Sequence, residues 1–189
     1  MASELRVDKI IPTGGVGTDT SNLRHGGGVI QIVEGVYSTQ QTITTTSTGS
    51  PEAIFDCDIT PKFATSKIRV ELVMMCSKLP FHTGYVYLFR GSTILRGLDQ
   101  GGHPASFACR HGNYTPGAGG NTYQRYAENR EYYTFLDNPQ TTSTITYNVK
   151  GSTTNASYPF YINRAEQYSG NSTDLVKCRC SLTLTEISA

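Results

Sequence analysis

Hydrophobic and polar residues alternate with a period of two in many short segments from Val29 to the end of the chain. Every second residue of the last segment is apolar: Val176, Cys178, Cys180, Leu182 and Leu184. Residues two apart on a strand share a face, so each segment predicts a strand with one apolar and one polar side. Strands of this kind are typical of antiparallel sheets that pack face to face.

The residues between these segments have turn chemistry. Gly-Ser at 91–92 separates YVYLFR from TILR and predicts a tight hairpin. Asp-Asn-Pro at 137–139 is expected to end the YYTFL strand, and Gly-Ser at 151–152 to end the TITYNVK strand. No long window keeps a helical period. We therefore predict an all-β fold over residues 29–189, an antiparallel two-sheet sandwich of jelly-roll type.

Residues 1–28 differ in composition from the rest of the chain. The amphipathic run LRVDKII ends at Pro12, and a segment rich in Gly and turn-forming residues follows it. Such a segment cannot bury enough apolar area to fold alone. The sequence therefore predicts an extended N-terminal arm, in which a short hydrophobic segment that can bind another surface is followed by a Gly-rich linker. A disordered leader is the alternative.

Two segments, YVYLF at 85–89 and YYTFL at 132–136, are apolar on both faces. A strand of this kind must be covered twice, once by the core of its own domain. The second cover is a neighbouring subunit, because exposed apolar patches usually mark interfaces; domain edges or long loops are the alternative. The candidate subunit-interface residues are Tyr85, Tyr87, Phe89, Tyr132 and Tyr133.

Charge and hydrophobicity limit the kinds of partner that the chain is expected to have. The net charge is +1 and there is no long basic run, which argues against nucleic-acid binding. No apolar stretch approaches the length of a membrane span, and the N-terminus lacks the apolar core of a signal sequence. Synthesis in a cytoplasm is therefore expected. The five cysteines do not have the spacing of a disulfide framework, so mostly buried thiols are expected.

Candidates for catalysis or metal binding are weak. Asp56 and Asp58 share a strand face, and paired carboxylates can hydrolyse glycosides, but these two lie among polar-face residues and are expected to be solvated or interfacial. His103, Cys109 and His111 carry zinc-binding atoms in the spacing H-x5-C-x-H, without an evident fourth ligand. We expect no enzymatic activity, no metal and no cofactor.

The long Gly-rich stretch 97–129 is the candidate binding loop. Long loops on a rigid β scaffold commonly carry binding sites, and Tyr and Arg are favoured contact residues. A passive loop at the end of the sandwich is the alternative. The candidate contact residues are Arg110, Tyr114, Tyr123, Arg125 and Tyr126.

The segments SELRVDKIIPTGG, GGGVIQIVE and ITPKFATSKIRVEL resemble small virion proteins and tail-fibre domains of tailed bacteriophages, including those of cyanobacteria. YLFRGSTIL, YYTFLDNP, STITYNVKGS and CSLTLTEIS are similar to strands of the same module, so the resemblance covers nearly the whole chain. It implies a homotrimeric β-sandwich fibre tip whose N-terminal peptide docks on the particle. The residues expected to dock are Leu5, Val7, Ile10 and Ile11.

The chain departs from the long-fibre pattern because it has no shaft of repeats or heptads. The resemblance therefore implies a short tail-fibre-type appendage of the virion, made in the host cytoplasm, that contributes to host-surface attachment. A capsid decoration, cement or head-fibre protein without a receptor role is the alternative, and a polysaccharide depolymerase is a third. The implied partners are other copies of the chain, proteins of the tail, baseplate or capsid, and a host glycan or outer-membrane protein.

Overall fold

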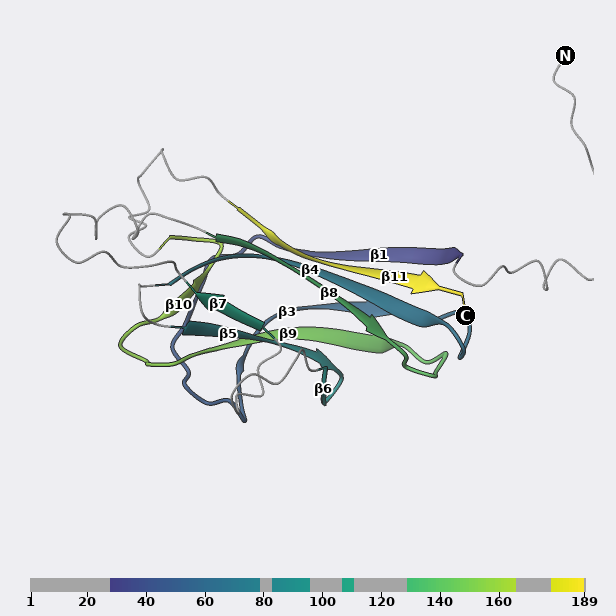
Figure 1. The fold of residues 1–189 in the computed structure, drawn as a ribbon, viewed down its shortest axis with the longest axis horizontal. Helices are drawn as coiled ribbons and strands as arrows, with labels where there is room; N and C mark the ends of the chain where they lie inside the picture. Colours follow the sequence, from purple (N-terminus) through teal and green to yellow (C-terminus); the bar gives the residue numbers. More distant parts are fainter. Residues whose placement is uncertain (1–27, 79–82, 96–106, 111–128, 166–177, 189) are drawn as a thin grey trace, which may run out of the picture.

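The computed structural model describes residues 28–78, 83–95, 107–110, 129–165 and 178–188. This part of the chain consists of eleven strands with their connections and contains no helix (Figure 1). The all-β prediction is confirmed. Accordingly, the described residues include no helix of the length and apolar character that crossing a membrane would require.

The strands form two antiparallel sheets. The first sheet contains, in spatial order, β1 (Val29–Tyr37), β11 (Cys180–Ile187), β4 (Lys67–Lys78) and β8 (Asn129–Asp137). Two short strands extend this sheet: β10 (Phe160–Ile162) pairs with the end of β4, and β2 (Gln41–Ile43) pairs with β10. The second contains β3 (Glu52–Ile59), β9 (Ile145–Thr153) and β5 (Thr83–Arg90), and β5 also pairs with β7 (Phe107–Arg110) and β6 (Thr93–Leu95).

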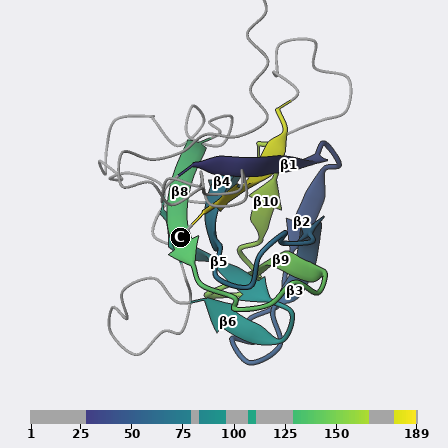
Figure 2. The ribbon, with the colours of Figure 1, turned by 90° about the vertical axis from the view of Figure 1, so that its right-hand side faces the viewer.

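The order of the strands identifies the topology. One sheet has the order β1-β11-β4-β8 and the other has the order β3-β9-β5-β7. This arrangement of eight antiparallel strands is that of a jelly roll, in which two Greek keys build two facing sheets. The predicted fold is confirmed. The two sheets lie one above the other in Figure 1, and Figure 2 shows β1 and β6 on opposite sides of the sandwich.

The core lies between the sheets and follows the period of two. The inward residues of β4 are Ile68, Val70, Leu72, Met74 and Cys76, and each is at most 1% exposed. Val86, Leu88, Tyr147 and Val149 of the second sheet are buried to the same degree. The rings of Tyr37 and Phe55 stack across the two sheets with their centroids 5.4 Å apart.

The predicted turns are mostly confirmed. Residues 91–92 connect β5 to β6, with Gly91 at a φ of 57°, and β8 ends at Asp137. The predicted end of β9 at 151–152 is wrong, because the strand continues to Thr153. Gly151 is buried and leaves room for Ile54, whose Cδ1 would lie 3.1 Å from an added Cβ. Small residues at this point make space in the core instead of ending the strand.

Three polar side chains join the sheets at one end of the sandwich. Asp137, at the end of β8, accepts hydrogen bonds from Arg90 of β5, whose Nη1 lies 2.9 Å from each carboxylate oxygen. The Tyr147 hydroxyl of β9 donates a third bond of 2.7 Å to Oδ2. Burial and the adjacent carboxylate raise the pKa of Tyr147, so its hydroxyl stays protonated and continues to donate.

Glu186 is a second buried carboxylate, on the inward face of β11. It accepts a 2.6 Å bond from Gln31 Nε2 of β1, and the backbone N–H groups of Lys62 and Phe63 donate at 2.8 and 3.3 Å. Burial by itself raises the pKa of Glu186, but the Ser66 side chain and these three hydrogen bonds together outweigh it and lower the pKa below its usual range. Glu186 thus ties β1 and the β3–β4 connection to β11.

Replacing Glu186 with Gln is expected to lower the free energy of unfolding by about 1–3 kcal/mol near neutral pH, because an amide cannot accept all three bonds. The lowered pKa means that the unfolded chain takes up this proton more readily than the folded chain. The stabilisation is therefore complete above the unfolded pKa of about 4.3 and is lost as pH falls through the folded pKa. Urea unfolding at neutral and acidic pH measures both effects.

The exposed Glu34 provides a matched control, since Glu34→Gln should leave stability unchanged within about 0.5 kcal/mol. If the difference in the free energy of unfolding between Glu186→Gln and the original chain stayed constant as the pH was lowered, the stabilising role of the Glu186 carboxylate would be contradicted.

Candidate functional site

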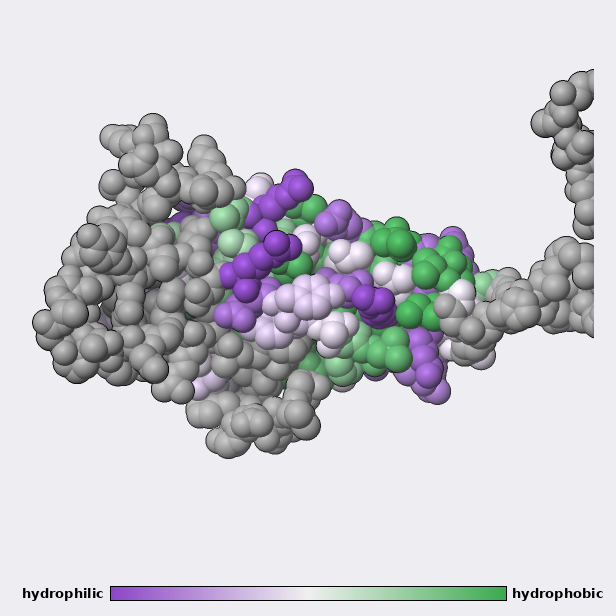
Figure 3. Space-filling view, turned by 45° about the horizontal axis from the view of Figure 1, so that its top comes forward, coloured by the Kyte–Doolittle hydropathy of each residue, from purple (hydrophilic) through white to green (hydrophobic). Residues whose placement is uncertain are grey.

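The candidate functional site is the outer face, which we define as the outward side of β1, β11, β4 and β8. Six large hydrophobic side chains are exposed among the described residues, and five of them lie on this face. They are Val29, Ile32 and Val36 of β1 and Tyr132 and Leu136 of β8, with exposed fractions from 49% to 63%. Figure 3 shows hydrophobic surface gathered on the right-hand half of the described part, beside more hydrophilic surface. A concentration of this kind usually marks an interface.

The strand register places these residues in rows across the sheet. One row consists of Ile32, Thr185, Arg69 and Leu136. A second row consists of Val36, Ser181, Val73 and Tyr132. In both rows the exposed apolar residues stand on the two outer strands, and the strands between them carry smaller, polar or less exposed side chains.

Tyr132 is held against the neighbouring strand by a charged pair. Arg69 donates to Glu71 over 2.6 Å, and the Tyr132 hydroxyl donates to the same carboxylate oxygen of Glu71. The bond from Tyr132, together with that from Arg69, lowers the pKa of Glu71. The Tyr132 ring is therefore fixed on the outer face with 56% of its surface exposed.

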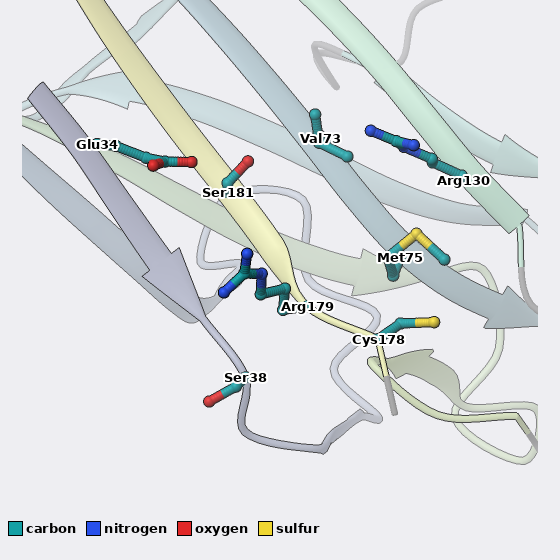
Figure 4. Close-up of a pocket in the computed structure, with 8 residues that line it drawn as sticks. All are labelled: Glu34, Ser38, Val73, Met75, Arg130, Cys178, Arg179 and Ser181. Carbon is teal, nitrogen blue, oxygen red and sulfur yellow. The ribbon is translucent and has the colours of Figure 1, made fainter. Parts of the chain in front are cut away.

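An open depression of about 840 Å³ lies at one end of the outer face (Figure 4). Its lining residues are Glu34, Ser38, Val73, Met75, Arg130, Cys178, Arg179 and Ser181. Figure 4 shows Arg130 on one side of Val73 and Met75, and Arg179 on the other side near Glu34. The lining carries two guanidinium groups against the one carboxylate of Glu34, so it suits a ligand with an acidic group better than a cation.

The structure does not bring the five predicted interface residues together. Tyr132 lies on the outer face of the first sheet, whereas Tyr85 and Phe89 are half-buried on the outward side of β5 in the second sheet. Lys150 Nζ lies 4.7 Å from the centroid of the Phe89 ring. These residues therefore belong to two different surfaces.

The remaining two predicted interface residues are covered within the single chain. Tyr87 has no exposed surface, and its hydroxyl shares a 2.9 Å hydrogen bond with Ser152. Tyr133 faces inward and packs against the core. Tyr87 therefore needs no second subunit to cover it, and neither residue belongs to the outer face.

The predicted docking and loop contacts lie largely outside the described residues. This holds for Leu5, Val7, Ile10, Ile11, Tyr114, Tyr123, Arg125 and Tyr126. The backbone of Arg110 ends β7, but its side chain is outside the description. These contacts, and the boundary between arm and sandwich, stay predictions.

The structure describes only some of the residues that were candidates for catalysis or metal binding. Asp56 and Asp58 are exposed on the outward side of β3, as expected. His103 and His111 lie outside the description, and so does the side chain of Cys109; the described residues contain no cluster of three metal-ligating side chains. The expected shared core face of Cys178 and Cys180 is wrong, because β11 begins at Cys180 and Cys178 lines the depression instead.

The sequence reasoning missed the exposed residues of β1. The segment VIQIVEGVY has apolar residues on both faces, the same signal that drew attention to the strands at 85–89 and 132–136. Applying that criterion to β1 would have found Val29, Ile32 and Val36. Leu136 lies in the segment 132–136, but only Tyr132 and Tyr133 of that segment are among the predicted interface residues.

No protein-family model and no curated protein matches the chain. Among solved structures, one similar chain belongs to the "Structure of infectious bursal disease virus Gt strain", with a TM-score of 0.38 and 13% identity. The alignment covers 100% of this chain and 43% of that chain, so this chain spans less than half the length of its neighbour. The assignment of the fold, an all-β jelly-roll sandwich, rests on the strand order.

Proposed function

We propose that the chain is a structural protein of a virus particle, a short fibre-type appendage of a tailed bacteriophage. The observation that carries the proposal is the outer face, where five exposed hydrophobic side chains gather on a rigid jelly roll. Jelly rolls occur in viral capsid and lectin domains, and an apolar face of this kind suits assembly. The fold also supports other functions, so the phage origin rests on the sequence resemblance.

In this proposal each part of the chain has a separate role. The N-terminal arm docks on the tail, baseplate or capsid through Leu5, Val7, Ile10 and Ile11. The sandwich associates with other copies, and a homotrimer multiplies weak contacts with the host. A host-surface glycan or outer-membrane protein meets the 97–129 loop and the depression, where Arg130 and Arg179 suit an acidic sugar. Catalysis, nucleic acid and membrane insertion have no role.

A capsid decoration, cement or head-fibre protein is the second candidate function. The same outer face supports it equally, because a clamp between capsid subunits also needs an apolar contact surface. The two functions differ in the position of the chain on the particle and in the host contact.

The position is tested by immunogold electron microscopy with antibodies against the purified chain, on particles from the culture in which it is made. Label on the tail or baseplate is the expected result. Label confined to the head surface supports the decoration protein instead, and particles without label overturn both. A serum absorbed with the purified chain serves as the control for unspecific labelling.

A further inference from the structure

We infer that β1 of one copy packs edge to edge against β8 of a second copy, in a head-to-tail contact. The partner of these two strands is thus another copy of the same chain. The inference rests on the proposed structural role and specifies how the copies meet.

The two strands occupy the two sides of the same sheet. Within the described part of the chain, β1 pairs with β11 and β8 pairs with β4, and no further described strand lies beside either one. Both strands have nine residues. Edge strands present N–H and C=O groups that can continue a ladder, and long apolar edges promote association.

The exposed hydrophobic side chains are confined to these two strands of the sheet. Val29, Ile32 and Val36 belong to β1, and Tyr132 and Leu136 belong to β8. The two inner strands, β11 and β4, carry none of the large hydrophobic residues that are exposed. Contact between the two edges therefore brings together the exposed residues Ile32 and Val36 of one copy and Tyr132 and Leu136 of the next. Contact through the middle of the face would not require this distribution.

The strand directions and the register fit such a contact. Each strand of the order β1-β11-β4-β8 is antiparallel to the next, so β1 and β8 run in opposite directions. A copy rotated about an axis parallel to the strands therefore presents its β8 antiparallel to β1, which continues the ladder. Rows at equal height place Ile32 beside Leu136, and Val36 beside Tyr132, of the next copy.

The charges favour a contact of β1 with β8 over a contact of two β1 edges. Glu34 is the one charged residue of β1, and Arg130 is the one charged residue on the outward side of β8. In the register that places Val36 beside Tyr132, Glu34 lies level with Thr134. An antiparallel contact of two β1 edges that pairs Ile32 with Val36 would instead place the two copies of Glu34 side by side, where like charges repel.

A head-to-tail contact has consequences for the assembly. It uses two different surfaces of each copy, so it closes into a ring or continues as a filament.

Charge-swap variants test the contact. Ile32→Lys and Leu136→Glu are each expected to weaken association of the purified chain at least about tenfold in sedimentation velocity, because a charge enters an apolar contact. The double variant I32K/L136E should regain association, because the introduced lysine of one copy then meets the introduced glutamate of the next. Thr183→Lys, in the middle of the outer face, should associate like the original chain. Circular dichroism verifies that every variant is folded.

The contact is wrong if the original chain is a monomer or stops at a dimer, if I32K/L136E dissociates as much as the single variants, or if Thr183→Lys dissociates. The last result would indicate face-to-face stacking. Immunogold labelling of particles is independent of these results, so a failed contact and a failed virion role are distinguished.

Discussion

Replacing Gly84 with Val is expected to destabilise the sandwich strongly. A Cβ atom at Gly84 would lie 2.3 Å from Cδ2 of Phe160, far inside van der Waals contact. Phe160 is fully buried, and its strand β10 is held between β4 and β2, so the ring cannot move aside. Overpacking of a core typically costs about 1–3 kcal/mol, and the rigid surroundings put this case at about 3 kcal/mol or more.

The loss is measured as the shift of the urea unfolding midpoint. Gly49→Ala is the matched control, because an added Cβ there meets no atom within 4 Å, and a change within about 0.5 kcal/mol is expected. The double variant Gly84→Val with Phe160→Ala should be less destabilised than the sum of the two single variants, since the ring that clashes is gone. Unchanged stability of Gly84→Val would show that β10 is not held as described.

Replacing Asp137 with Ala is expected to lower the free energy of unfolding by about 3 kcal/mol. The change leaves Arg90 without its carboxylate partner and removes the acceptor of the buried Tyr147 hydroxyl. Breaking a buried ion pair from one side costs about 3–5 kcal/mol. The lower end applies because the Arg90 side chain remains 28% exposed, and water can compensate part of the loss.

Two further variants separate the parts of this network. Tyr147→Phe removes one bond to the carboxylate and should cost about 1.5–3 kcal/mol. Arg69→Ala breaks the ion pair with Glu71 on the outer face, where the Arg69 side chain is 51% exposed, and should lower stability much less than Asp137→Ala does. Equal losses for Asp137→Ala and Arg69→Ala in urea unfolding would refute a special role of the Asp137 network.

Much of the fold is predictable from local pattern. Alternation on β4 assigns Ile68 through Cys76 to one face, and the turn at 91–92 is predictable from Gly91, because these features depend on neighbours along the chain. The end of β9 is not predictable in this way. Gly151 has the chemistry of a turn, but a close approach to Ile54 from another strand keeps it inside the sheet.

The candidate site shows the same division between local and long-range information. The sequence by itself determined that certain strands are apolar on both faces, and hence that each needs two covers. Only the tertiary structure decided which of them keep a face in solvent. Tyr87 of β5 is fully buried, with its hydroxyl hydrogen-bonded to Ser152 of β9. The jelly-roll order places β1 and β8 on the two sides of the other sheet, where Ile32 and Leu136 are exposed. Strand neighbours come from pairings between distant parts of the chain, and a period of two carries no information about them.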